Sequence, residues 1–125
     1  AASFAKKNIV VVGAHQAVPA LLAEQGLIAG KYNKNLASPI IRQAFEAAKA
    51  IGALDIGQAA IAEDGRVLTL EAVEGTDAMI NRVKQLRESG RASASPKMGV
   101  LVKAMKPSQD MRADLPAIGP DTIAA

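Results

Sequence analysis

The order of apolar and polar residues along the chain predicts alternating strands and helices. Ile9–Val12 is a continuous β-branched run that ends at Gly13, which is typical of a buried strand. The next residues, AHQAVPALLAEQG, indicate a polar turn and then a short helix, with Pro19 near its start and Gly26 past its end. The segment GLIAGKYNKN holds two glycines and two asparagines, and we expect it to form a loop.

A longer helix is predicted to begin at Ser38 and Pro39, because a cap oxygen precedes a residue whose φ is already helical. Gly52 is expected to close it. Its apolar residues recur at helical spacing: Ile41, Ala44, Ala48 and Ile51. The run IGQAAIAEDGRVLTLEAVEG then predicts a β-hairpin, since two strand-like segments flank Asp64-Gly65, a pair suited to a tight turn.

A second helix is expected after the hairpin, with Thr76 as its cap, Asp77 in its first turn and Gly90 at its end. Its apolar stripe comprises Met79, Ile80, Val83 and Leu86. RASASPK indicates a loop, MGVLVKAM a further buried strand and GPDTIAA the start of a helix. This order predicts one domain over residues 1–125, of the α/β or α+β class, with a mixed β-sheet flanked by helices.

Composition excludes several classes of function. The aromatic residues are Phe4, Tyr32 and Phe45, too few for the base stacking of single-stranded nucleic-acid binding, and no block of basic residues indicates a nucleic-acid tail. The absence of cysteine excludes disulfides and thiolate sites, and it is compatible with a reducing, cytoplasmic setting. A net charge of +3 favours anionic partners. No apolar run approaches the ~20 residues that cross a bilayer, so we expect a soluble chain, or one peripheral to a membrane.

Two polar segments are candidates for chemistry. In EGTD, Thr76 and Asp77 suit a helix cap and its dipole, whereas Glu74 and Gly75 suit a metal ion near bound phosphate. In KAMKPSQDMRADLPAIGPDT, Asp110 and Asp114 lie four residues apart with Arg112 between them. Carboxylates suit magnesium, and three cations could neutralise phosphate charge: Lys103, Lys106 and Arg112. The alternative is a solvated loop whose ions pair with one another.

His15, the single histidine, follows the first predicted strand and is either structural or in contact with a ligand. The chain has no Gly-x-Ser-x-Gly elbow, Walker loop or dinucleotide fingerprint. On chemistry alone, the sequence predicts a phosphate-binding α/β domain with carboxylates.

Three long segments follow one another as in a known family: VVGAHQAVPALLAEQGLI, AAKAIGALDIGQAAIAEDGRVLTLEAVEGTDAMINRV and GVLVKAMKPSQDMRADLPAIGPDTI. Together they resemble the C-terminal domain of LpxI-type UDP-2,3-diacylglucosamine pyrophosphatases over nearly the full chain. The resemblance implies magnesium-dependent hydrolysis of UDP-2,3-diacylglucosamine to UMP and 2,3-diacylglucosamine 1-phosphate, in lipid A biosynthesis. It also implies work in the cytoplasm, against the inner face of the inner membrane.

The resemblance further implies roles for individual residues. Asp110 or Asp114 would hold magnesium or activate the attacking water, with Asp110 ranked first, and Glu74 and Asp77 would be further metal ligands. Asp55 would line the same chamber. The residues expected to bind substrate are Gln109, Arg112, Lys106, Lys103, Thr76, Gly75, Gln58 and His15.

The family's N-terminal domain and its glycine-rich final segment have no counterpart in these 125 residues, so the resemblance implies a fragment whose chamber is incomplete. Two alternatives to an enzyme therefore stay open. One is a nucleotide-sugar or phosphate-binding module that kept the fold and lost the chemistry, and the other is a structural or oligomerisation domain. A homo-oligomer is left open as well.

Overall fold

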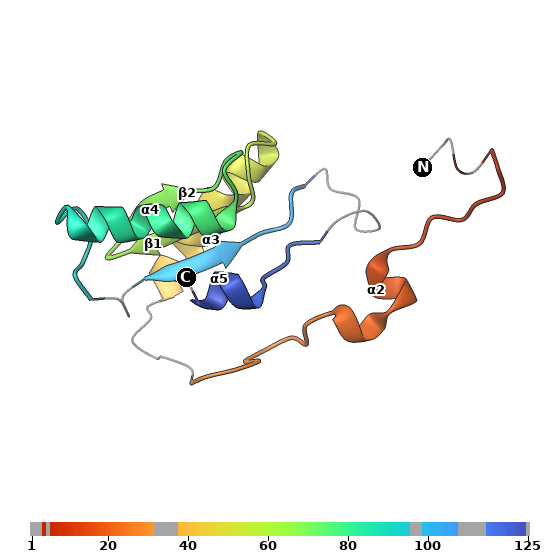
Figure 1. Ribbon diagram of the computed structural model, residues 1–125, viewed down its shortest axis with the longest axis horizontal. Helices are drawn as coiled ribbons and strands as arrows, with labels where there is room; N and C mark the ends of the chain where they lie inside the picture. Colours follow the sequence, from red (N-terminus) through yellow and green to blue (C-terminus); the bar gives the residue numbers. More distant parts are fainter. Residues whose placement is uncertain (1–3, 5, 32–37, 96–98, 108–114, 125) are drawn as a thin grey trace. The chain divides into compact units, whose positions relative to one another are not determined.

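The structure is a computed structural model that describes residues 4, 6–31, 38–95, 99–107 and 115–124 (Figure 1). By their contacts, these residues divide into two compact units. The first holds the described residues up to 31 together with Leu115, and the second holds residues 38–107 and 116–124.

The first unit contains two short helical pieces, α2 (Ala14–Ala17) and the 3₁₀-helix η1 (Pro19–Leu21). The backbone N–H of Gly13 donates to Gln16 Oε1 at 2.9 Å, which closes the start of α2. Pro19 begins η1 because its fixed φ suits the first helical position. The predicted short helix therefore exists as two pieces, and residues 26–31 form the expected loop.

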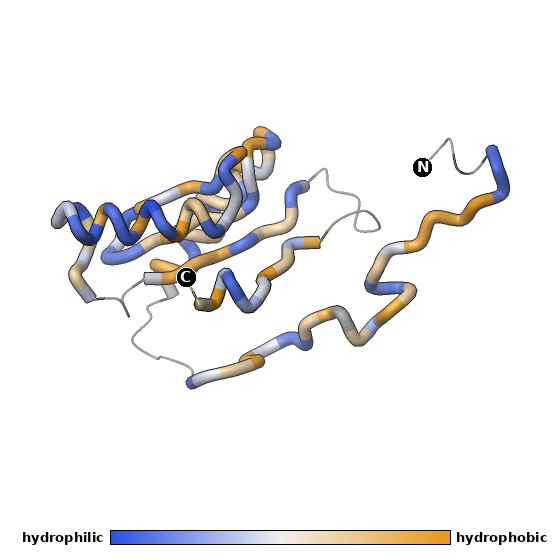
Figure 2. Tube along the Cα trace, viewed as in Figure 1, coloured by the Kyte–Doolittle hydropathy of each residue, from blue (hydrophilic) through white to orange (hydrophobic). Residues whose placement is uncertain are grey.

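The strand predicted at Ile9–Val12 is wrong, since these residues adopt no regular structure. Ile9, Val10 and Val12 are 49%, 82% and 53% exposed, although Figure 2 colours this run as hydrophobic. The physical reason is pairing: a strand needs a neighbour to bond its N–H and C=O groups, and the three described strands pair only with one another. A run of β-branched residues has a high propensity for a strand, but it does not provide the neighbouring strand with which to pair.

The second unit carries the sheet, with strand order β2-β1-β3 and antiparallel pairing throughout the described residues. Its elements are α3 (Ser38–Ala53), β1 (Ala59–Glu63), β2 (Arg66–Leu70), α4 (Thr76–Glu88), β3 (Val100–Lys103) and α5 (Pro120–Ala124). The α/β or α+β class is confirmed, as are both long helices, the hairpin, the last strand and the closing helix. The described sheet is antiparallel and not mixed as predicted, because β1 pairs antiparallel with both β2 and β3. None of the described helices is long and apolar enough to span a membrane.

The hairpin turn forms at Asp64-Gly65, as predicted. The φ angles of Asp64 and Gly65 are 49° and 77°, and two consecutive positive values suit the twist of a two-residue hairpin. Gln43 of α3 donates from Nε2 to the Gly65 carbonyl at 2.8 Å, so the turn is fastened to the helix behind it.

Both faces of the sheet are covered, because alternate residues of β1 point to opposite sides. Ala59 and Ile61 pack with Met79 and Val83 of α4 in one cluster. On the other side, Ala60 packs with Ala48 of α3 and with Ala104. Figure 1 shows α3 and α4 on the two sides of the sheet, and every residue of β1 is buried between them.

The N-terminus of α4 differs from the prediction, since Gly75 rather than Thr76 occupies the N-cap position. Gly75 has φ 83°, and no described side chain caps this end of the helix. Thr76 is instead the first residue of the helix, and its hydroxyl donates to Glu71. Asp77 lies in the first turn as expected, and Gly90, with φ 69°, follows the last turn.

A buried carboxylate fixes the far end of β1. Glu63 is 1% exposed, and its Oε2 accepts a hydrogen bond from Arg87 Nη2 at 2.9 Å. Its Oε1 accepts from the backbone N–H of Ser93 at 2.6 Å. Because a buried charge is tolerated only when paired, these bonds hold the end of α4 and the following loop against the strand.

We predict that Gly57→Ala strongly destabilises the fold. A Cβ at this position would lie 2.1 Å from the Glu71 carbonyl oxygen, so backbone must move. Urea unfolding followed by circular dichroism should show a loss of about 3 kcal/mol, the upper range for overpacking. Gly119→Ala is the control, because a Cβ there meets no atom within 4 Å. Equal stability of the two variants would contradict the close approach.

Candidate functional site

A chain of hydrogen bonds joins β3, α4 and the residue that follows β2. Lys103 Nζ donates to Thr76 Oγ1 at 2.9 Å, and Thr76 Oγ1 donates to Glu71 Oε1 at 2.5 Å. Lys103 Nζ also donates to the carbonyl oxygen of Ala117 at 2.9 Å. We call Lys103, Thr76 and Glu71 the lysine relay. It places an ammonium group beside the first residue of α4.

The backbone around Gly57 and Gln58 holds the buried end of the relay. Glu71 is 7% exposed, and its Oε2 accepts from the backbone N–H of Gln58 at 3.0 Å. The Glu71 N–H donates to the carbonyl oxygen of Ala59 at 2.9 Å, and glycine at position 57 permits the close approach. Gln58 Oε1 is buried and has no hydrogen-bond partner among the described residues.

The relay gathers three residues that were expected to bind substrate: Lys103, Thr76 and, through its backbone, Gln58. Sequence reasoning missed Glu71, because attention went to Glu74 in the neighbouring EGTD segment. The sequence did offer a signal in the position of Glu71. This residue directly follows the strand residues RVLTL, and a charged side chain next to buried backbone needs a partner.

The first turn of α4 is also fixed by α5. Thr122 Oγ1 donates to Asp77 Oδ1 at 2.8 Å, so Asp77 orients the closing helix. Gly75 leaves this helix end without a side-chain cap among the described residues. The backbone N–H groups of a first helical turn have no acceptor within the helix, which makes such an end attractive to anions.

Glu74 is committed to an ion pair on the surface of α4. Its Oε1 lies 2.8 Å from Arg82 Nη2, and the same Nη2 donates to the carbonyl oxygen of Leu70 at 2.6 Å. Among the described residues, no group of three or more histidine, cysteine, aspartate or glutamate side chains could hold a metal ion. The expected role of Glu74 and Asp77 as magnesium ligands, together with Asp110 and Asp114, stays a prediction.

Asp55 and Lys106 form an ion pair, with 2.7 Å between Lys106 Nζ and Asp55 Oδ1. Asp55 has φ 56° just past α3, where its N–H donates to the Gly52 carbonyl oxygen at 3.1 Å. The hydrogen bond from Lys106, and then its positive charge, hold the pKa of Asp55 below its ordinary value. The two residues expected in the chamber thus contact each other.

Five of the predicted site residues lie outside the part of the second unit that the structure describes. Gln109, Asp110, Arg112 and Asp114 lie outside the described residues, so their proposed roles stay predictions. His15 belongs to α2 in the first unit, and its Nδ1 is buried without a hydrogen-bond partner in the described part of the chain.

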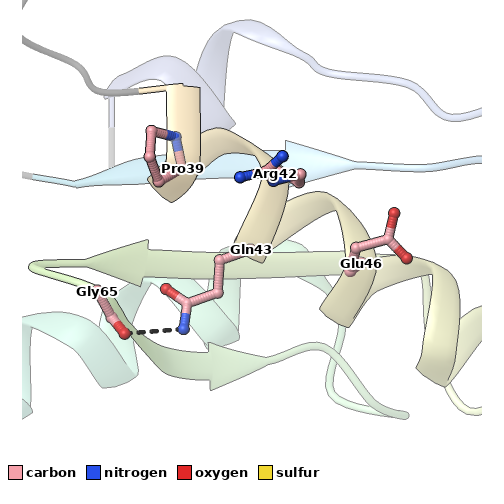
Figure 3. Close-up of a pocket in the computed structure, with 5 residues that line it drawn as sticks. All are labelled: Pro39, Arg42, Gln43, Glu46 and Gly65. Carbon is pink, nitrogen blue, oxygen red and sulfur yellow. Dashed lines mark hydrogen bonds between the residues drawn. The ribbon is translucent and has the colours of Figure 1, made fainter.

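An open pocket of about 420 Å³ lies along α3 (Figure 3). It is lined by Pro39, Arg42, Gln43, Glu46 and Gly65, and the bond from Gln43 to the Gly65 carbonyl crosses it. None of its lining residues belongs to the relay or to the predicted phosphate-handling segment. We take the relay as the candidate functional site because its hydrogen bonds join residues that were expected to bind substrate.

A comparison with protein families identifies the family of the chain. Residues 24–125 match the family described as the LpxI C-terminal domain. The chain belongs to the LpxI family. It is 44% identical over 124 residues to the UDP-2,3-diacylglucosamine pyrophosphatase LpxI of Caulobacter vibrioides, an alignment that covers 96% of this chain and 43% of that protein. The chain thus spans less than half the length of this curated LpxI protein.

The family match confirms the resemblance drawn from the sequence, and it includes the whole relay and the segment from Lys103 to Thr122. His15 precedes the matched residues. The prediction that residues 1–125 form one catalytic domain stays a prediction, and the contacts within the described chain separate the first 31 residues from the sheet.

We predict that Thr76→Val destabilises the fold by about 1–3 kcal/mol, because a carboxylate and an ammonium each lose a partner. Thermal or urea unfolding measures the change. Thr69→Val is the matched control: Thr69 Oγ1 is buried without a partner among the described residues, so its removal should be neutral or stabilising. A harmless Thr76→Val would show that the relay contributes nothing to stability.

We predict that Asp55 titrates below the ordinary aspartate range and that Lys106→Met raises its pKa. A depressed pKa means that the ion pair contributes stability above the pKa of the unfolded chain, and that this contribution is lost as the pH falls through the folded pKa. Carboxyl carbon NMR measures the titration. Lys49→Met, which removes an ammonium 5.5 Å from the Phe45 ring, is the control and should leave Asp55 unchanged. An unshifted Asp55 in Lys106→Met would disprove the assignment.

Proposed function

We propose that the chain is the C-terminal catalytic domain of a UDP-2,3-diacylglucosamine pyrophosphatase. The reaction is hydrolysis of UDP-2,3-diacylglucosamine to UMP and 2,3-diacylglucosamine 1-phosphate, with water attacking the phosphorus nearer the sugar. The observation that carries the proposal is membership of the LpxI family, with 44% identity along nearly the whole chain to a protein that bears this name. The relay supports it as a site suited to phosphate.

Lys103 is the cation that the geometry favours for contact with the diphosphate. An ammonium has three N–H donors, and Lys103 uses two of them on Thr76 and Ala117. The third can donate to a phosphate oxygen while the other two keep the group in place. The uncapped first turn of α4 lies beside it, and its N–H groups and helix dipole add to the attraction.

The proposal assigns the chemistry to the segment KPSQDMRADLP. Asp110 or Asp114 activates the attacking water or holds magnesium, Gln109 orients a phosphate oxygen, and Arg112 contacts the diphosphate. Magnesium bound there would neutralise diphosphate charge and polarise the phosphoryl group. Lys106 would join Arg112 in contacting the diphosphate, beside its ion pair with Asp55.

The setting follows from the same proposal. The substrate carries two acyl chains, so the enzyme would act on the cytoplasmic face of the inner membrane, through a peripheral contact. The family's N-terminal domain would complete the substrate chamber. The proposal therefore applies to the longer protein, and the 125 residues alone would contribute one side of the chamber.

The test is UMP release from UDP-2,3-diacylglucosamine with magnesium, comparing this chain with a longer chain that restores both flanking regions. We expect hydrolysis by the longer chain, and a loss on the order of 10²-fold or more for Asp110→Ala with folding retained. Glu88→Ala, an exposed residue in the last turn of α4, is the control and should keep full activity.

Two outcomes would contradict this proposal in different ways. Full activity in both Asp110→Ala and Asp114→Ala would remove the aspartates from the mechanism but leave the function. No UMP release by a well-folded longer chain would favour a nucleotide-sugar-binding module instead.

A further inference from the structure

The direction of each hydrogen bond in the relay is dictated by chemistry. The ammonium of Lys103 can only donate, and a carboxylate at Glu71 can only accept. The hydroxyl of Thr76 lies between them, 2.9 Å from the first and 2.5 Å from the second. It must therefore give its proton to Glu71 and offer a lone pair to Lys103.

Glu71 is rigid enough to set this direction. Its side chain is nearly fully buried, and its second oxygen is held by the Gln58 N–H at 3.0 Å. Its own N–H is bonded to Ala59 of the buried central strand, and the backbone at Gly57 is packed directly against its carbonyl. The carboxylate cannot rotate without breaking bonds to the core of the sheet.

Lys103, by contrast, is a flexible side chain that would lose rotamer freedom on binding an anion. Two fixed acceptors, on α4 and on the segment before α5, remove that freedom in advance. Its third N–H has no partner among the described residues. Preorganisation of this kind improves affinity because the ordering cost is met before the ligand arrives.

We propose that Glu71 is a positioning residue for the substrate diphosphate. It acts through Thr76 to hold the Lys103 ammonium beside the N-terminus of α4, without touching the substrate itself. This inference rests on the proposed function for its ligand, a nucleotide-sugar diphosphate. It goes beyond it by assigning a role to a residue that the phosphate-handling segments did not include.

The decisive variant is Glu71→Gln, which keeps the shape of the side chain and replaces one of its two acceptor oxygens by an NH₂ donor. If the amide oxygen accepts the Thr76 proton, the NH₂ group faces the Gln58 N–H, and two donors meet. If the amide is turned, the NH₂ group faces Thr76, and the Thr76 proton loses its acceptor at position 71. In both orientations, one of the two hydrogen bonds that the Glu71 carboxylate accepts is lost.

The kinetic test is a double-mutant cycle in the longer, active protein, with Glu71→Gln, Lys103→Met and the combination. We expect each single change to raise KM for UDP-2,3-diacylglucosamine about tenfold, and the double variant to be no worse than Lys103→Met alone. Thr76→Val should behave like Glu71→Gln, and Thr76→Ser, which keeps the hydroxyl, should restore binding. Thr69→Val again serves as the control and should leave KM unchanged.

The second readout does not depend on activity. Nitrogen NMR of lysine ammonium groups should show slow proton exchange for Lys103 in the unaltered protein, and fast exchange in Glu71→Gln and Thr76→Val. Slow exchange that persists in Glu71→Gln would overturn the positioning role.

The arms separate the two proposals. Additive losses in the cycle, or a normal KM in Glu71→Gln beside a raised KM in Lys103→Met, would overturn the positioning role and keep the function. If Glu71→Gln abolishes the slow proton exchange of Lys103, but the longer protein does not hydrolyse UDP-2,3-diacylglucosamine, then Glu71 does hold the ammonium in place. The proposed substrate would then be wrong. Normal kinetics in Lys103→Met would exclude both the lysine and its positioning residue from substrate binding.

Discussion

The burial of β1 on both faces is the constraint on which the rest of the second unit depends. A strand covered on one side by α3 and on the other by α4 has no exposed face for a polar residue. Four of its five residues are apolar, three of them alanines, which let both helices approach closely. The two buried carboxylates, Glu63 and Glu71, lie at the ends of this strand, where the sheet meets loops and helix termini.

Each end of the strand carries one buried carboxylate, and each is neutralised in a different way. Glu63 is paired directly with Arg87, an interaction that fastens helix to sheet. Glu71, bonded to the backbone at the other end, reaches its cation through a hydroxyl. In a direct ion pair, the two charges would neutralise each other. The Thr76 hydroxyl between Glu71 and Lys103 instead leaves the ammonium at the surface of the site with one N–H donor unused among the described residues.

The residues show why sequence reasoning succeeded for some elements and failed for others. The hairpin and both long helices were predictable because their signals are local: Asp64-Gly65 for positive φ, and apolar residues at helical spacing. Ile9–Val12 carried an equally strong local signal, but a strand also depends on a partner, which local sequence does not reveal. Thr76 was assigned as a cap because its preference for helix starts is visible in the sequence, whereas its hydrogen bond to Glu71, five residues earlier, follows no such pattern.

Lys103 and Lys106, on either side of Ala104 and Met105, restrict the length of the chain segment that leaves the sheet. Lys103 is anchored on α4 and on Ala117, whereas Lys106 is anchored at the end of α3 by a contact 51 positions away in sequence. Ala104 is bonded to Gln58 between them. The spacing of these anchors is set by three separate elements, so the stretch cannot absorb an inserted or deleted residue as a surface loop can. Residues 103–106 therefore form an exit from the sheet whose length is fixed by hydrogen bonds at both ends.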